Sequence, residues 1–320
     1  MKKLLFLTLC SLLCTAPTSA QQGEPEYVTP TSIVAASSAD EWVAIDPDDL
    51  LVMQLAPDGA GNPRTVVIQL IPAPFSQPWV ANIRTLARAE WWDGTSVNRV
   101  QDNYVTQWGD VTEEKPLPEG VTAPEASYAV GARDSCNFSS ERGHRVFADC
   151  PIGQFILPDV AVVGGHVGFE KGWPLARAEH SLWPIHCYGY VGVGRGYAPD
   201  TGTGAELYTV IGQPQRHMDR NLAVIGRVIE GMQHLSSLPR GSGELGFYTE
   251  EEAHLRVPII SIRLGSELAD APSSEYLSTD SESFAQYVHV RANRNDSFYR
   301  SPAGGVDICN VEVPVRRVGE

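Results

Sequence analysis

Few residue patterns in this sequence are typical of acid–base, nucleophilic or metal chemistry. His180 and His186 have a spacing that zinc fingers use, but no cysteine pair stands upstream to complete such a site. The sequence contains no Gly-x-Ser-x-Gly or His-Glu-x-x-His motif, so a serine or zinc hydrolase has no support. Gly192, Gly194 and Gly196 form a glycine string that precedes no helix of the dinucleotide-binding type. We interpret this string as a place where the backbone approaches a substrate closely.

The most informative stretch is WWDGTSVNRVQDNYVTQWGD, from Trp91 to Asp110. It follows a predicted helix, turns at an Asp-Gly pair and continues as a strand that contains Arg99. An arginine in a strand is most often solvated or ion-paired, and Gln107 by itself is an ordinary polar strand residue. A catalytic role for these residues therefore depends on the whole block and on the other sequence blocks that occur with it. Two further blocks follow downstream, VGVGRGYAPDTGTGAELYTVIG (191–212) and HMDRNLAVIGRVIEGMQHLSSL (217–238).

In this order, the three blocks resemble segments of the cyclophilin family of peptidyl-prolyl cis-trans isomerases. The first block is similar to the family's aromatic-Asp-Gly-Thr turn, its Arg-Val strand end and its later aromatic, Gln, Gly and Asp. The resemblance extends over about 50–110 and 188–264 and includes an opening hairpin and the helix SQPWVANIRTLARA. It implies isomerisation of Xaa–Pro bonds in Pro-containing polypeptides. This reaction has no net proton transfer and needs neither a cofactor nor a metal.

Rotation about an Xaa–Pro bond is slow because resonance gives the C–N bond double-bond character, with a barrier of about 18–20 kcal/mol. Twisting frees the nitrogen lone pair, which a cationic donor then binds better than in either planar state. The resemblance assigns this donor to Arg99 and makes Gln107 a second polar contact or the residue that orients Arg99. It places Tyr104, Val105 and Tyr208 beneath the proline ring. It adds further substrate contacts at Gly194, Arg195, Glu206, Leu207, His217, Met218 and Leu222.

Several of these positions depart from the family's pattern. Glu206 and Leu207 stand where the family usually has Gln and Phe, and His217 or Met218 stands where it has a large aromatic residue. Leu222 takes the place of a histidine. The predicted donor is retained while the surrounding residues differ. We therefore keep a second interpretation, in which a catalytically weak or inactive module binds Pro-containing segments as a chaperone or scaffold.

The elements that must position these residues are mostly short strands. The runs at 50–55 and 65–71 flank a turn signal and predict a hairpin. Ser76 is a suitable N-cap for a helix that runs to about Ala89, with one apolar stripe facing the sheet. Strands are also predicted at 188–193, 206–211, 222–228 and 257–264, and further helices at 230–238 and 281–293. The pattern predicts a mainly β fold, a closed antiparallel β-barrel capped by helices.

The chain divides into segments of different composition. Residues 1–20 have the charged, apolar and small-residue layout of a signal peptide, which predicts an exported protein, periplasmic or secreted. Residues 21–40 are polar and predict a flexible leader, and residues 41–320 form the barrel domain. A Pro- and Gly-rich insertion interrupts this domain at about 111–185, and a C-terminal extension follows at about 265–320.

Four cysteines remain after the predicted signal peptide, and in an oxidising compartment they can pair in three ways. The spacing favours Cys136–Cys150 as a small loop within the insertion and Cys187–Cys309 as a bridge to the end of the chain. The formal net charge of −15 argues against a nucleic-acid partner, whose phosphates require a basic surface. No later segment is apolar enough to span a membrane, and we expect a monomer.

Overall fold

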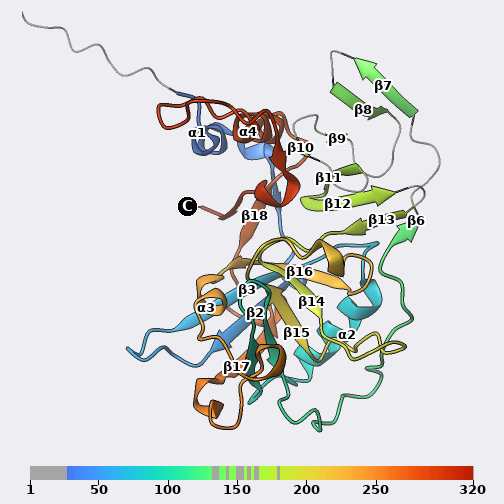
Figure 1. The fold of residues 1–320 in the computed structure, drawn as a ribbon, viewed down its shortest axis with the longest axis vertical. Helices are drawn as coiled ribbons and strands as arrows, with labels where there is room; N and C mark the ends of the chain where they lie inside the picture. Colours follow the sequence, from blue (N-terminus) through green and yellow to red (C-terminus); the bar gives the residue numbers. More distant parts are fainter. Residues whose placement is uncertain are drawn as a thin grey trace, which may run out of the picture.

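The structure is a computed structural model that describes residues 27–131, 137–141, 144–148, 155–156, 160–161, 166–178 and 181–319. Its lower part in Figure 1 is a closed antiparallel barrel, which confirms the predicted fold class. In pairing order its strands are β14 (Tyr190–Val193), β15 (Leu207–Val210), β5 (Val105–Gly109), β4 (Ser96–Val100), β17 (Val257–Leu264), β2 (Leu50–Leu55), β3 (Arg64–Leu70) and β16 (Val224–Glu230). The strands predicted on both sides of the insertion are all members of this barrel.

The predicted hairpin is confirmed as β2 and β3, and its turn explains its register. The Asp58 carboxylate accepts hydrogen bonds from the backbone N–H groups of Ala60 and Asn62, both at 2.9 Å. This fixes the turn so that Leu55 pairs with Arg64 where the strands begin to separate. Both faces of β2 are covered, and its sequence is therefore a nearly continuous apolar run instead of an alternating one.

Helix α2 (Gln77–Arg88) lies against the barrel, in contact with β16 and β17. The stripe predicted to face the sheet is buried, and it consists of Trp79, Val80, Ile83, Leu86 and Ala87. Ser76 is the N-cap residue, as predicted, but its side chain does not cap the helix. Ser76 has left-handed backbone angles, with a φ of 50°, and its side chain makes no capping hydrogen bond. A capping side chain reaches the first-turn N–H groups from an extended backbone conformation, which Ser76 does not have.

The helix predicted at 230–238 is much shorter than expected. Strand β16 continues to Glu230, and helix α3 covers only Gln233–Ser236. Between them Gly231 turns the chain with a φ of 81°, and a Cβ at this position would lie 2.1 Å from the carbonyl oxygen of Thr65. A glycine is therefore required here, and it separates the strand from the helix.

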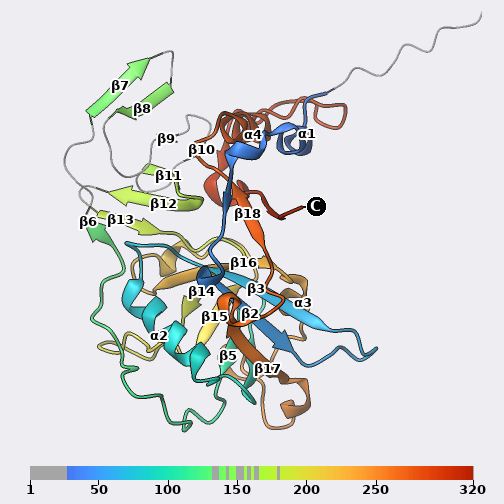
Figure 2. The same cartoon turned by 180° about the vertical axis from the view of Figure 1, so that it is seen from behind.

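The two ends of the described chain pack together (Figure 2). Helix α4 (Glu282–Ala292) confirms the helix predicted at 281–293, and the side chain of Ser281 caps it by accepting a hydrogen bond from the N–H of Phe284. It contacts α1 (Pro30–Ala36), which lies inside the segment expected to be a flexible leader. Helix α1 forms because Thr29 supplies a capping box at its start and because Ile33 is buried. The polar composition of this segment did not indicate a helix, because the helix is stabilised by its contact with the C-terminal extension.

A second sheet is built from the region expected to be a mostly irregular insertion. In pairing order it contains β6 (Val130–Gly131), β13 (Ser181–Pro184), β12 (Trp173–Ala178), β11 (His166–Glu170), β9 (Phe155–Ile156), β8 (His144–Ala148) and β7 (Asn137–Glu141), all antiparallel. The sheet contacts α4, where the rings of Phe169 and Phe284 meet edge-on with centroids 5.1 Å apart. Its strands span two to six residues, too short to show a clear period in the sequence.

The C-terminal extension is joined to the remainder of the molecule by short strands and by a disulfide. A three-stranded antiparallel sheet contains β1 (Trp42–Ala44), β18 (Ser274–Leu277) and β20 (Val315–Arg317), while β10 (Val160–Ala161) pairs in parallel with β19 (Val306–Asp307). The predicted disulfide Cys187–Cys309 is present, with Cα atoms 5.1 Å apart. The predicted pair Cys136–Cys150 lies outside the described residues. In the part of the chain that the structure describes, none of the helices has both the length and the apolar character needed to cross a bilayer.

Candidate active site

Arg99 and Gln107, the predicted catalytic pair, lie side by side on two adjacent barrel strands. Arg99 belongs to β4 and Gln107 to β5, and the two residues are direct partners in the register. The register shifts between Val97 and Arg99, and a bulge of this kind redirects the side chains next to it. Arg99 Nη1 donates a hydrogen bond to Gln107 Oε1 at 3.1 Å. The turn between the two strands thus brings the two side chains into direct contact.

The guanidinium of Arg99 is also held along its other edges. Its Nε donates to the carbonyl oxygen of Leu245 at 2.7 Å, and its Nη2 donates to Gln101 Oε1 at 2.5 Å. Its central carbon lies 5.4 Å from the ring centroid of Tyr104 and 5.2 Å from that of Phe247, both within cation–π range. Three of its five N–H groups thus have acceptors among the described residues, and each terminal nitrogen keeps one N–H for a substrate.

The charge of this arginine is available to a substrate. Burial lowers the pKa of Arg99, but a guanidinium remains charged at any physiological pH. The acceptors that hold it among the described residues are two side-chain amides and a backbone carbonyl, all of them neutral. A charge that is oriented by dipoles, without neutralisation by a carboxylate, interacts strongly with electron density that develops beside it.

A small apolar cluster, separate from the main core, lies beside the guanidinium. It consists of Val105, Tyr208, Val210 and Met218, with Tyr104 and Leu222 packed against it. Side chains alternate along β15, so Tyr208 and Val210 belong to this cluster while Leu207 belongs to the main core. Tyr104 connects the cluster to the arginine, because its ring flanks the guanidinium and its hydroxyl contacts Met218 Sδ at 3.1 Å. The structure thus brings most of the predicted apolar contacts together and places Leu207 apart from them.

Two other predicted contacts lie at the edge of this cluster. His217 is exposed and stacks on Tyr104, with ring centroids 6.0 Å apart and planes inclined by 17°. Arg195 is turned toward a neighbouring loop, where its Nε and Nη2 donate to the carbonyl oxygen of Asn221 at 3.2 and 3.1 Å. His217 therefore extends the aromatic surface of Tyr104, whereas Arg195 connects two loops.

Glu206 lies behind Gln107, immediately before β15. Gly194 donates its backbone N–H to the carbonyl oxygen of Glu206 at 2.8 Å. The side chains of Gln107 and Asn98 and the backbone N–H of Asp110 lie close to the carboxyl group of Glu206 and, as hydrogen-bond donors, act to lower its pKa. Burial raises the pKa of Glu206 to about 7, against the opposing effect of these hydrogen bonds. The predicted contact Glu206 thus lies next to Gln107.

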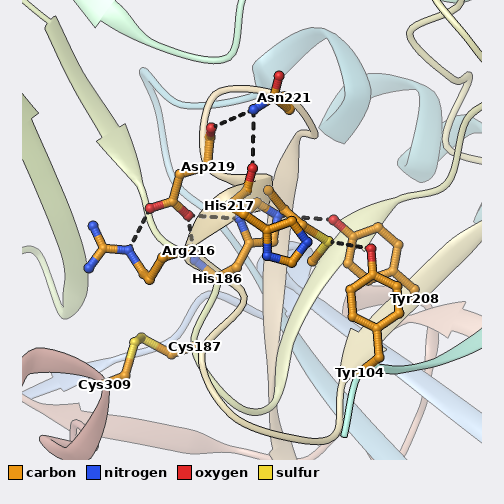
Figure 3. A network of polar contacts seen from close by, with 10 residues as sticks. Tyr104, His186, Cys187, Tyr208, Arg216, His217, Asp219, Asn221 and Cys309 are labelled. Carbon is orange, nitrogen blue, oxygen red and sulfur yellow. Dashed lines mark hydrogen bonds and ion pairs between the residues drawn. A yellow bond between two sulfur atoms is a disulfide. The ribbon is translucent and has the colours of Figure 1, made fainter. Parts of the chain in front are cut away.

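A buried polar chain lies directly behind the apolar cluster (Figure 3). His186 bonds through Nε2 to the hydroxyl of Tyr208 at 2.9 Å and through Nδ1 to Asp219 Oδ1 at 3.0 Å. Asp219 also accepts a hydrogen bond from Arg216 Nε at 2.6 Å. The chain joins the tyrosine at the base of the cluster to the loop that carries His217 (Figure 3).

The protonation states along this chain follow from burial. Burial lowers the pKa of His186, so its ring is neutral. Burial opposes ionisation of Asp219, but hydrogen bonds from His186 and Arg216 outweigh it and lower the pKa of that carboxyl. The ionised carboxylate must accept, so His186 Nδ1 donates to it, and Nε2 then accepts from the hydroxyl of Tyr208. Each member of the chain therefore has one fixed role as donor or acceptor.

Sequence reasoning missed several residues of this site. Leu245 and Phe247 contact the guanidinium from a loop that begins about 140 residues further along the chain, and the hydrogen bond from Arg99 to Leu245 spans 146 residues. No local pattern indicates a contact at that distance. His186 stands out in the sequence only through its spacing to another histidine, whereas its burial and its partner Asp219 appear only in the fold.

Comparisons with known proteins agree with this arrangement. Residues 64–263 match the family model described as cyclophilin type peptidyl-prolyl cis-trans isomerase/CLD. Among solved structures, the crystal structure of cyclophilin AquaCyp293 from Hirschia baltica superposes with a TM-score of 0.61 at 20% sequence identity. The alignment covers 91% of this chain and 98% of that chain, and at this identity it supports the fold alone. None of the curated proteins gives a significant match.

Proposed function

We propose, since this chain belongs to the cyclophilin-type peptidyl-prolyl cis-trans isomerase family, that it catalyses rotation about Xaa–Pro bonds in polypeptides. The observation that carries the proposal is the arrangement around Arg99. Three neutral acceptors fix its guanidinium, which keeps N–H groups without an acceptor among the described residues, beside an apolar cluster of the character that suits a proline ring. The family's substrates are Pro-containing peptides, and this arrangement accounts for both halves of an Xaa–Pro unit.

Catalysis follows from the difference between the planar and twisted states of the bond. In the planar amide the nitrogen lone pair is delocalised and accepts hydrogen bonds poorly, whereas in the twisted state it is localised on nitrogen. A fixed N–H of Arg99 therefore binds the twisted state more strongly than either ground state, and this differential binding lowers the barrier. Because the three protein acceptors and two rings already orient the guanidinium, little reorganisation is needed during the reaction.

The apolar cluster supplies the complementary part of the mechanism. A proline ring that rests on Tyr104, Val105 and Met218 is held still, so rotation occurs at the carbonyl side of the bond. Tyr208 cannot move easily beneath it, because its hydroxyl is bonded to buried His186. In this proposal the buried polar chain keeps the base of the cluster rigid and takes no part in proton transfer.

We also propose that the protein acts outside the cytoplasm, in the periplasm or after secretion, and assists the folding of exported proteins. The support is the layout of residues 1–20 together with the Cys187–Cys309 disulfide, a type of bond that persists in oxidising compartments. Fractionation of the producing cells and N-terminal sequencing of the mature protein test this. Recovery of the full chain in the cytoplasm, with free thiols at both cysteines, contradicts it.

The enzyme assignment is tested by exchange NMR on a panel of Xaa–Pro peptides, with wild type, Arg99→Ala and Arg88→Ala proteins. Arg88 is a suitable control, because it is an exposed arginine of α2 whose ion pair with Glu267 lies outside the site. We expect catalysis by wild type and Arg88→Ala. Loss of a well-placed donor typically costs about 10²–10³ in rate, and we expect a loss of this size for Arg99→Ala.

The outcomes separate the two interpretations of the sequence. A wild-type protein that gives no acceleration over the thermal rate, yet binds these peptides, is the non-catalytic binding module. An active wild type whose rate survives Arg99→Ala is an isomerase with a different mechanism. Peptide binding that is nearly unchanged in Arg99→Ala, with turnover lost, is the result that the proposed mechanism requires.

A further inference from the structure

The carboxyl group of Glu206 occupies a space that two glycines leave open. A Cβ at Gly109 would lie 1.8 Å from Glu206 Oε1, so any side chain at that position would displace the carboxyl group. A Cβ at Gly194 would lie 3.1 Å from Glu206 Cβ and 3.5 Å from Gln107 Nε2. Gly109 in β5 and Gly194 just after β14 thus leave room for the side chain of Glu206 beside Gln107.

The groups that face this carboxyl group are mainly donors. Gln107 and Asn98 reach it with their side chains and Asp110 with its backbone N–H. Asn98 is 4% exposed, and its Oδ1 has no partner among the described residues. Among charged groups, Glu113 influences the carboxyl group most directly, and it carries a like charge. The cation on the other side of Gln107 is Arg99, which donates a hydrogen bond to the Gln107 amide. The side chain of Asp110 points away, because it accepts from its own loop.

We propose that Glu206 is a positioning residue that determines which end of the Gln107 amide faces Arg99. An ionised carboxylate can only accept hydrogen bonds, so it requires the Nε2 end of Gln107. This leaves Oε1 for Arg99 Nη1, the contact seen at 3.1 Å. The reversed amide would place oxygen against carboxylate and an N–H₂ group against the guanidinium, and both contacts are repulsive. A glutamine at position 206 could donate or accept and would not impose this orientation.

The device depends on pH because the carboxyl group titrates near neutrality. Burial raises the pKa of Glu206 to about 7, and a protonated carboxyl group can donate as well as accept. Below about pH 7 the reversed amide therefore becomes permissible, and Arg99 loses the acceptor at Nη1 for part of the time. This inference deepens the proposed function and rests on it where turnover is concerned, but the orientation of Gln107 can be measured without a substrate.

The test is NMR on the isotope-labelled protein without peptide, from about pH 5.5 to about pH 8.5. We expect the Glu206 side-chain carboxyl carbon, the Gln107 side-chain amide and the Arg99 Nε–H to titrate together, with a midpoint of about 7. In Glu206→Gln the signals of Gln107 and Arg99 should no longer change over this range. In the control Glu113→Gln the coupled titration should persist with a lower midpoint, because a nearby like charge has been removed. The inference is overturned by a Glu206 midpoint near 4.5, or by signals of Gln107 and Arg99 that do not follow Glu206.

Kinetics supply the second arm of the test. We expect kcat/KM of the wild type to fall about three- to tenfold from about pH 8 to about pH 6, with little change in KM, and the profile of Glu206→Gln to be flat. An inactive wild type with a coupled NMR titration defeats the proposed function and leaves the positioning role intact. An active wild type with an uncoupled titration defeats the positioning role alone.

Discussion

Arg99 owes its proposed role to the shape of its side chain as much as to its charge. The planar guanidinium reaches Leu245, Gln107 and Gln101 with three of its N–H groups and also lies within cation–π range of two aromatic rings. A lysine would carry the same charge as a single ammonium group on a flexible stem. It could satisfy some of these acceptors, but it could not also present fixed N–H groups to a substrate.

We therefore expect Arg99→Lys to recover little of the activity that Arg99→Ala loses, remaining within about tenfold of it. Exchange NMR on a Pro-containing peptide measures the rate, and isothermal titration calorimetry measures the affinity. Similar peptide affinity in wild type and Arg99→Lys would show that the deficit lies in the twisted state. A lysine variant with close to wild-type turnover would show that charge alone is sufficient.

Phe247 supplies the second aromatic ring beside the guanidinium and was not indicated by the sequence. A cation–π contact at a partly exposed site is worth about 0.5–1 kcal/mol, so Phe247→Ala should lower kcat about two- to fivefold through looser orientation of Arg99. Phe298→Ala is a matched control, because Phe298 is 82% exposed and meets the ring of Tyr299 edge-on in the C-terminal extension. Equal rates for the two variants would remove Phe247 from the site.

The sequence identified residues whose partners lie nearby in the chain and missed those whose partners lie far away. Arg99 and Gln107 belong to one strand–turn–strand unit, so a single block of sequence contains both. Leu245 contributes its backbone carbonyl, which no side-chain pattern can reveal. Leu207 was predicted as a contact from its place in a block, but strand alternation turns its side chain into the main core.

At the scale of elements, the site depends on how β15 and the 3₁₀ turn η3 (Arg216–Met218) are joined. Tyr208 lies on β15, and Asp219 follows η3. His186 stands between them and bonds to both, so these elements are connected by a buried polar chain. Breaking a buried network of this kind leaves an unpaired group in the interior, which is strongly destabilising.

The pH dependence of the free energy of unfolding should include a contribution from His186. Its pKa is lowered from the model-compound value of 6.5, so below about pH 6.5 the unfolded chain takes up a proton that the folded chain does not. The free energy of unfolding should therefore fall as the pH drops from about 7.5 to about 5.5. In His186→Gln, which can still donate to Asp219 and accept from Tyr208, this part of the decrease should vanish. Urea unfolding of both proteins at the two pH values measures the difference.

Wild type must be compared with His186→Gln because Glu206 changes the free energy of unfolding with pH in the opposite direction to His186. Its pKa is raised from 4.5 to about 7, so its contribution to stability is present below about pH 4.5 and is lost as the pH rises through 7. Glu206 is the same in wild type and His186→Gln, so its effect cancels in their difference. An identical pH dependence in the two proteins would show that His186 does not titrate differently on unfolding.

The barrel elements were more predictable than the sheet of the insertion. Strands β2 and β3 are continuous apolar runs that flank an Asp turn, and the apolar stripe of α2 has a helical period. Strands β9 and β10 span two residues each, and strands of that length are defined by their neighbours instead of by their own sequence. Helix α1 likewise depends on contact with α4, which is distant in the chain.

At the scale of the whole molecule, the Cys187–Cys309 bond joins the segment leading into barrel strand β14 to the C-terminal extension. The two cysteines are separated by 122 residues, so the bond restricts a large part of the unfolded chain. Cys187 is buried and directly follows His186, so the bond is also close to the polar chain behind the site (Figure 3). The extension is thus covalently tied to the vicinity of the site.

Removal of this bond should destabilise the protein by about 3–5 kcal/mol, by analogy with other disulfides that close long loops. The variant Cys187→Ala/Cys309→Ala, compared with wild type by thermal and urea unfolding, measures the effect without leaving a free buried thiol. Addition of reductant to the variant reports separately on Cys136 and Cys150. A melting temperature equal to that of the wild type would mean that the bond adds no stability.

The pairing of early with late strands has a consequence for when the protein can fold during its synthesis. Strand β2 can pair with β3 early in synthesis, but its other partner is β17, and β1 pairs with β18, so both strands reach these partners only after more than 200 further residues have been made. Until then the nascent chain has no closed barrel and remains pliable. A chain without a closed barrel can still be threaded through a narrow pore. Here the barrel can close only after β17 has been synthesised, which happens when the last quarter of the chain is being made.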